Sequence, residues 1–170
     1  MNILEEIQNC PVEWKELGEV VDVLDSLRRP ITKSQRIPGD IPYYGANGIQ
    51  DYVKDWIFDG TFILMGEDGS VIKNDNSPIL HWVVGKIWVN NHAHILGEVA
   101  GCALLKYVYY VLSQTDVSDI VRGTPPKLNQ KNLKSIKIPI PPLEIQEKIV
   151  QILDKFTDYV TELTSELTSE

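Results

Sequence analysis

Residues 141–170 read PPLEIQEKIVQILDKFTDYVTELTSELTSE, and this stretch determines how the rest of the chain is organised. Its apolar residues follow one another in alternating steps of four and three: Ile145, Ile149, Ile152, Phe156, Tyr159 and Leu163. That spacing lays one narrow apolar seam along a helix, the pattern by which helices pair in a coiled coil. We therefore predict a long helix that needs a partner helix.

The two ends of this helix differ. Pro141 and Pro142 suit its start, because a proline in the first turn has no amide hydrogen to leave unsatisfied. No glycine, proline or basic turn closes the other end, and the sequence stops inside a Leu-Thr-Ser-Glu repeat, 163–166 and 167–170. We expect the helix to be cut off or completed by another chain. A solvated acidic tail is the plainer alternative.

Composition places the chain among globular, unexported proteins. Its 170 residues, 43% hydrophobic, suffice for one domain with a core and an appended helix. Cys10 and Cys102 form neither a CxxC pair nor a metal-ligand spacing, which favours a reduced, cytoplasmic setting. The N-terminus lacks the basic start and apolar run of a signal peptide, and no apolar stretch approaches the ~20 residues that span a bilayer.

The net charge of −8 argues at first against a nucleic-acid partner. Residues 144–170 alone carry a net charge of −5, however, which leaves a net charge of −3 for the rest of the chain. That rest contains two basic clusters without acids: Arg28, Arg29, Lys33 and Arg36, then Arg122, Lys127, Lys131, Lys134 and Lys137. Local cations attract phosphates, although solvated loop charge explains them equally well from composition alone.

Residues 1–100 predict a series of strands. Trp14 and Leu17 suggest a short amphipathic turn that Gly18 ends, followed by a strand over 20–24 and an irregular basic loop over 26–39. The apolar run 61–65, the turn 66–69 and residues 70–72 predict a β-hairpin. Further strands are expected at 79–84, 87–89 and 93–96.

The following residues predict helices packed on that sheet. The spacing of Leu104, Leu105, Val108 and Leu112 predicts a helix over 100–113, and 128–133 suit a short one. The alternation over 136–140 predicts an edge strand, because Pro139 cannot donate to a ladder. The expected fold class is α+β: a globular recognition domain, 1–140, with a mixed or antiparallel sheet, followed by a coiled-coil helix, 141–170.

No motif for catalysis or for a metal appears. The sequence holds no GxSxG, Walker or GxGxxG pattern and no Asn/Asp-Pro-Pro-aromatic motif of an adenine methyltransferase. The acid-x-Lys triplet at 13–15 lies on the expected amphipathic turn, upstream of where a nuclease would need it. His92 and His94 share a strand face, with His81 nearby in sequence, but no carboxylate or cysteine at a matching spacing completes a metal site.

Two sequence features, residues 66–69 and the tyrosine pair, can each be explained in two ways. The stretch Gly66-Glu67-Asp68-Gly69 suits a tight turn, since glycine and aspartate supply the backbone angles, and it could also hold a cation. Tyr43 and Tyr44 could pack in the core or stack on bases. Adjacent strand residues face opposite ways, so we expect one ring to be buried.

Taken together, several stretches resemble one family, the specificity subunits of type I restriction-modification enzymes. They are 14–20 (WKELGEV), 39–49 (GDIPYYGANGI), 89–96 (VNNHAHIL), 128–133 and, most distinctive, 136–146 (IKIPIPPLEIQ) with 149–150 and 152–154. They cover nearly the whole chain in the family's order. The chain resembles half of such a subunit: one target recognition domain and one conserved spacer helix.

This resemblance implies sequence-specific DNA recognition by a non-catalytic chain. Methylation and cleavage would belong to modification and restriction subunits, where S-adenosylmethionine and ATP should bind, and the chain itself would need no cofactor. Family members usually carry two recognition domains and two antiparallel helices. This half would therefore pair with a second copy, helix to helix, as a homodimer that docks modification subunits.

The resemblance also directs attention to loop residues. In a DNA-recognition domain, cations position the protein on phosphates and polar side chains reach base edges. The cations predicted to contact phosphates are Arg28, Arg29, Lys33, Arg36 and Lys127. Loop position alone suggests Tyr44, Asn47, Ser70, Asn91 and Thr124 as base-reading residues. The six residues of the apolar seam are the predicted helix interface.

The helix would also set the distance between two recognition domains. From Pro142 to Glu170 it would extend about 43 Å, more than one DNA turn of roughly 34 Å, so two domains could reach two half-sites across an unread spacer. Each four-residue repeat adds ~6 Å of helix. Inserting one should therefore lengthen the preferred spacer by about one or two base pairs.

Two other functions fit less of the sequence. One is a specificity-subunit mimic or regulator that binds the subunits of the complex without DNA. The other is a carbohydrate-binding module with Trp56, Trp82 and Trp88 as stacking surfaces, although tryptophans in apolar strands usually belong to the core. DNA binding by the purified chain, with and without a modification subunit, separates the three.

Overall fold

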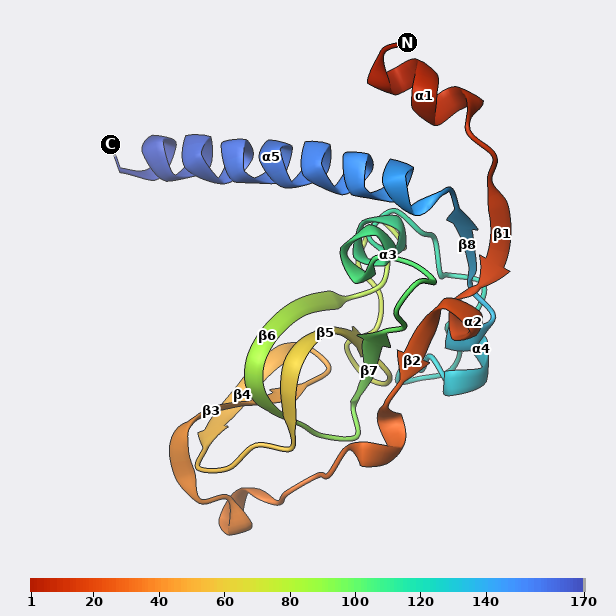
Figure 1. The fold of residues 1–170 in the computed structure, drawn as a ribbon. Helices are drawn as coiled ribbons and strands as arrows, with labels where there is room; N and C mark the ends of the chain where they lie inside the picture. The colour runs from red at the N-terminus through yellow and green to blue at the C-terminus, as the bar shows by residue number, and fades with distance from the viewer. Residues whose placement is uncertain (170) are drawn as a thin grey trace.

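A six-stranded sheet lies at the centre of the computed structural model, which describes residues 1–169 (Figure 1). The strand order is β2-β7-β5-β6-β3-β4, with neighbours antiparallel except β3 and β6, which are parallel. The strands are β2 (Val21–Val23), β3 (Pro38–Gly45), β4 (Gly48–Val53), β5 (Phe58–Gly66), β6 (Leu80–Val89) and β7 (Ala93–Glu98). The predicted α+β class with a mixed sheet is confirmed.

The central strand β5 is buried on both faces. Ile63 and Met65 pack in one core cluster, and Leu64, pointing the other way, packs in a second. A strand covered on both sides needs no polar alternation, which explains the continuous apolar run at 61–65. The long strand β6 is strongly curved (Figure 1) and contributes Val83, Ile87 and Val89 to the second cluster. It contains Gly85 at φ +100°, a conformation that L side chains rarely adopt.

Short helices cover the first cluster. Helix α3 (Leu105–Leu112) buries Leu105, Val108 and Leu112 there, as its spacing predicts. It begins later than expected, because Gly101 at φ +81° forms a turn before it. Helices α2 (Leu17–Val20) and α4 (Gln130–Lys134) pack beside each other, and two 3-10 turns, η1 (Asp25–Leu27) and η2 (Lys33–Gln35), lie in the basic loop.

A second, two-stranded sheet leads into the long helix. Strands β1 (Glu13–Glu16) and β8 (Lys137–Ile140) pair antiparallel, so the predicted edge strand is confirmed. Helix α5 (Leu143–Thr168) follows and extends away from the globular part, and α1 (Ile3–Asn9) lies near its start (Figure 1). Glu170, the last residue of the predicted helix, lies outside the described residues. Within residues 1–169, no helix combines the length and the apolar character required to cross a membrane.

Three local predictions are wrong. The turn at 66–69 does not fold β5 back onto 70–72, because β6 and β7 already occupy both sides of β5. Trp14 lies on strand β1 rather than on an amphipathic turn, since it pairs with Pro139 of β8. The strands predicted at 79–84 and 87–89 form one strand, Leu80–Val89, because β6 continues through Gly85.

Candidate nucleic-acid interface

Four loops meet beyond the C-terminal end of β5 and the N-terminal end of β7. They comprise residues 25–29, 66–70, 90–93 and 122–128, and we call them the loop cluster. The backbone amide of Leu128 donates to the carbonyl of Glu67 at 2.7 Å, and that of Glu67 donates to the carbonyl of His92 at 2.9 Å. Most of the predicted DNA contacts come from these loops: Arg28, Arg29, Ser70, Asn91, Thr124 and Lys127.

The other predicted contacts lie along segment 29–48, which continues from the loop cluster. Its start is fixed against the end of β6, because the Trp88 indole Nε1 donates to the Arg29 carbonyl at 2.6 Å. Lys33 is exposed in η2, and Asn47 is exposed in the turn between β3 and β4.

The tyrosine pair behaves as predicted. Tyr43 is buried, and its hydroxyl accepts a hydrogen bond from the backbone amide of Ile31 at 3.0 Å. Tyr44 is only half-buried and lines an open hollow of about 510 Å³ together with His81 and Trp82. Burial lowers the pKa of His81, so this hollow offers a neutral imidazole and aromatic rings.

The cations predicted to contact phosphates fall into two groups. Arg29, Lys33 and Lys127 are exposed and make no ion pair among residues 1–169. Arg36 pairs with Asp51 at 3.3 Å and lies 4.3 Å from the centre of the Tyr43 ring. Arg28 is mostly buried and has protein acceptors. Three cations are therefore open to a phosphate and two already have partners; all five assignments stay predictions.

Arg28 belongs to a buried group that sequence reasoning missed. We call Asp25, Arg28, Glu67 and His94 the charge cluster. The Nη1 of Arg28 donates to Oε2 of Glu67 at 3.0 Å, and His94 Nδ1 lies 2.6 Å from Oδ2 of Asp25. The Nε2 of His94 lies 2.7 Å from the carbonyl of Leu128. Each ring nitrogen of His94 therefore lies within hydrogen-bond distance of an oxygen atom.

The Asp25 carboxylate bonds to the His94 ring and lies 3.8 Å from Nη2 of Arg28. Burial, the largest influence, raises the pKa of Asp25, but the hydrogen bond and charge of His94, the backbone amide of Ile95 and the charge of Arg28 together bring it below its usual 3.8. The carboxylate is therefore ionised at neutral pH. Only His94, a polar residue inside an apolar strand, signals such a site in the sequence; Asp25 and Glu67 are distant along the chain.

The charge cluster also has the composition of a metal site. Ligand atoms of Asp25, Glu67 and His94 lie within 4.8 Å of one another, so carboxylates that the sequence spacing did not reveal do flank His94. Arg28 supplies positive charge there, and the Leu128 carbonyl accepts from His94, so the set is explained without a metal ion. His92 does not join it, because it lies in the preceding turn and bonds to Asp68.

The apolar seam on α5 is the second candidate surface. Its inner end is covered by the chain's own domain, since Ile145 is buried and Ile149 half-buried. Its outer part is exposed, with relative exposures of 44% for Ile152, 65% for Phe156, 60% for Tyr159 and 41% for Leu163. Four successive seam positions thus lack cover from residues 1–169, which marks an interaction surface.

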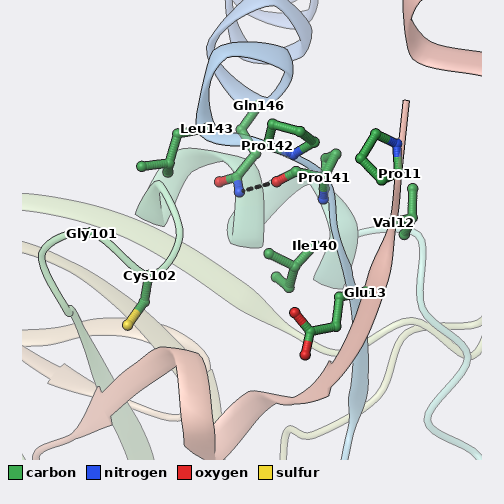
Figure 2. Close-up of a pocket in the computed structure, with 10 residues that line it drawn as sticks. All are labelled: Pro11, Val12, Glu13, Gly101, Cys102, Ile140, Pro141, Pro142, Leu143 and Gln146. Carbon is green, nitrogen blue, oxygen red and sulfur yellow. Dashed lines mark hydrogen bonds between the residues drawn. The ribbon is translucent and has the colours of Figure 1, made fainter. Parts of the chain in front are cut away.

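Gln146 fixes the base of α5 to the domain. Its buried side chain accepts a hydrogen bond from the backbone amide of Leu104 and donates one to the carbonyl of Pro141. Both hydrogen bonds are 2.9 Å long. Figure 2 shows the bond to Pro141 beside a hollow of about 390 Å³ that Cys102 and Ile140 also line. Two turns further along, the Tyr110 hydroxyl bonds to Asp154, and burial together with this bond raises the pKa of Tyr110 to about 12. The helix therefore leaves the domain in a fixed direction.

Comparison with known proteins gives consistent matches. The family model described as Type I restriction modification DNA specificity domain matches residues 11–170. A putative type I restriction enzyme specificity subunit of Haemophilus influenzae, S.HindORF215P, is 44% identical over 159 residues, covering 92% of this chain and 40% of that relative. The chain thus spans less than half the length of this curated relative.

Solved structures show the same fold at low sequence identity. The S subunit of a type I restriction-modification system from M. genitalium superimposes with a TM-score of 0.71 at 20% identity, over 97% of this chain and 44% of the other. A second solved structure is described as the structural basis of complex assembly and conformational transition of the type I R-M system. It superimposes with a TM-score of 0.68 at 18% identity, over 96% of this chain and 45% of the other.

Proposed function

Because the chain belongs to the family of type I restriction-modification DNA specificity domains, we propose that it recognises a specific DNA sequence as one half of a specificity subunit. The loop cluster is the observation that carries this proposal, since exposed cations and polar side chains from four loops stand together there. Such a surface suits DNA, where phosphate contacts position a protein and base contacts specify the sequence.

Each class of side chain has an assigned part in this recognition. Arg29, Lys33 and Lys127 would contact phosphates, because their charges are exposed and unpaired within residues 1–169. Arg36 would have to exchange Asp51 for a phosphate. The residues that would reach base edges or stack on bases are Tyr44, Asn47, Ser70, Asn91 and Thr124.

A second copy of the chain would cover the outer part of the apolar seam. An antiparallel pair of α5 helices places one recognition domain at each end, whereas a parallel pair would bring both domains to the end where α3 already packs on α5. The 26 residues of α5 extend about 39 Å, more than one DNA turn of roughly 34 Å. The dimer would thus hold two domains over two half-sites with a spacer between them.

The exposed residues favour one register for this pair. Antiparallel packing that buries the exposed seam positions sets Ile152 against Leu163 of the second copy and Phe156 against its Tyr159. In that register Lys155 faces Glu162 of the second copy, twice by symmetry. Neither residue has an ion-pair partner within residues 1–169, so each charge is available to the other copy.

Catalysis would come from other subunits. Modification subunits would dock along the helix pair and supply methylation with S-adenosylmethionine, and restriction subunits joined through them would supply cleavage with ATP. The chain would then act without a cofactor of its own. One structural relative is described as showing complex assembly of the type I R-M system, which supports such partners.

Lys127→Ala should weaken DNA binding about equally on every sequence and lower the slope of log affinity against log salt concentration by about one, because one phosphate contact is lost. Fluorescence anisotropy with labelled duplexes at several salt concentrations measures both. Lys137→Ala is the matched control, since Lys137 lies on β8 and pairs with Glu16.

An unchanged salt slope would remove Lys127 from the phosphate contacts. If the wild-type chain binds no DNA with or without modification subunits, the proposal fails, and a regulator that binds the complex without DNA takes its place.

A further inference from the structure

We propose that the charge cluster holds the DNA-reading loops in their relative positions, and that Arg28 is a positioning residue for sequence discrimination rather than a phosphate contact. This inference rests on the proposed function and concerns the same surface. It reassigns Arg28 from the phosphate contacts to a positioning role. It also gives Asp25, Glu67 and His94 a role in recognition.

The charge cluster bonds to all four loops of the loop cluster. Arg28 comes from the first loop and donates to the second through Glu67 at 3.0 Å. It also donates to the third, through the carbonyls of Ala93 at 2.9 Å and Asn91 at 3.4 Å. His94 bonds to Leu128 at the end of the fourth and to Asp25 in the first. Removing one member therefore removes a side-chain bond between at least two loops, which then keep only their backbone bonds.

Two of the predicted base-reading residues, Asn91 and Ser70, lie close to these bonds. The carbonyl of Asn91 is itself an acceptor of Arg28, and the predicted phosphate contact Lys127 precedes the bonded Leu128. Ser70 follows Glu67 within the same short turn, where its backbone amide donates to the carbonyl of Asp68 at 3.1 Å. Binding groups must be held within fractions of an ångström by the residues behind them, so a shift of the cluster would be felt at these side chains.

The surroundings of Arg28 exclude a simple phosphate contact. Its side chain is only 13% exposed, and its Nε donates to the carbonyl of Asp25 at 2.9 Å while Nη1 serves the three acceptors named above. A planar guanidinium can bond in several directions at once, which a lysine ammonium on its flexible stem cannot reproduce. Removing one partner from such a buried group would leave a charge uncompensated, which costs free energy. The charge cluster is therefore more stable with all of its bonds formed.

Arg28→Lys separates the two roles. It keeps the positive charge, so a phosphate contact would keep most of its affinity and its salt dependence. If Arg28 positions the loops, the same change should reduce the ratio of specific to nonspecific affinity by about tenfold or more, the size of one lost base contact, with an unchanged salt slope. Arg122→Lys is the matched control, because Arg122 is exposed in the fourth loop, makes no ion pair in residues 1–169 and is not among the predicted DNA contacts.

Glu67→Gln provides a second, opposite test. A carboxylate cannot bind phosphate, and removing a negative charge beside DNA should by electrostatics alone strengthen binding to every duplex. Under the positioning role it should instead lower discrimination as Arg28→Lys does, since an uncharged amide at this position would no longer neutralise the guanidinium. Both variants can be checked for folding by thermal melting.

The probes are a duplex selected by the wild-type chain, assembled with modification subunits, from a random-sequence library, and a scrambled duplex of equal length. If a variant only loses folded protein, its apparent affinity falls equally for the selected and the scrambled duplex, and the ratio of the two affinities stays unchanged. That result overturns the positioning role. Unchanged discrimination in folded Arg28→Lys and Glu67→Gln overturns it as well. A wild-type chain that selects no sequence would instead overturn the proposed function itself.

Discussion

Replacing Phe156 and Leu163 with aspartate should leave the chain monomeric at concentrations where the wild type is a dimer. Both side chains are exposed in the single chain and buried in the proposed register. Burying one such side chain contributes roughly 1.5–3 kcal/mol, and each dimer loses four of them. The dissociation constant should therefore rise by more than about 100-fold, which corresponds to only ~2.8 kcal/mol.

Sedimentation equilibrium measures this change directly. Thr161→Asp is the matched control, because residue 161 lies on the face of α5 opposite to the seam and is exposed. Circular dichroism should show the same helix content in all variants. If the double variant dimerises as tightly as the wild type, the seam is not the interface.

Reversing one charge on α5 should weaken self-association, and mixing two such variants should restore it. In the proposed register Lys155→Glu places like charges opposite Glu162 twice in each homodimer, and Glu162→Lys does so opposite Lys155. Exposed pairs contribute about 0.2–1 kcal/mol each. Turning two attractive pairs into repulsive ones costs about 2 kcal/mol, or about 30-fold in the dissociation constant. The mixed dimer regains both attractive pairs.

Native mass spectrometry of the two variants, one carrying a mass tag, should show mainly the mixed dimer. Glu147→Lys, an equal charge change on the opposite face of α5, should leave self-association unaltered. In a parallel pair Lys155 would lie beside Val160 of the other copy, so reversal would not favour mixing. A statistical mixture of dimers would thus contradict the antiparallel register.

The long helix could be predicted because its evidence is local. Steps of four and three place Ile152, Phe156 and Tyr159 on one face whatever surrounds the helix, and α5 has that face exposed. The covered inner end could not be predicted in this way. Ile145 and Ile149 carry the same spacing, and only the packing of the domain on α5 distinguishes them from the outer positions.

Tertiary contacts account for what the sequence did not reveal. The chain bends at Gly69 and Ser70, at the end of the predicted turn, whereas Gly66 still belongs to β5. Local backbone preferences do not determine which strand pairs with β5, and its neighbours are β6 and β7. The charge cluster joins Asp25, Glu67 and His94 from three separate segments, so no spacing along the chain indicates it. Arg28, classed by sequence with the exposed cations, proves to be bonded within that cluster.

Mapping methylated sites in cells that express this chain with modification subunits tests the central claim most directly. A symmetric dimer of one recognition domain should direct methylation to two inverted copies of a single half-site separated by an unread spacer. A variant with one additional Leu-Thr-Ser-Glu repeat, about 6 Å of helix, should keep the half-sites and lengthen the spacer by about one or two base pairs. A continuous or asymmetric site, or a spacer that the insertion leaves unchanged, would contradict this account.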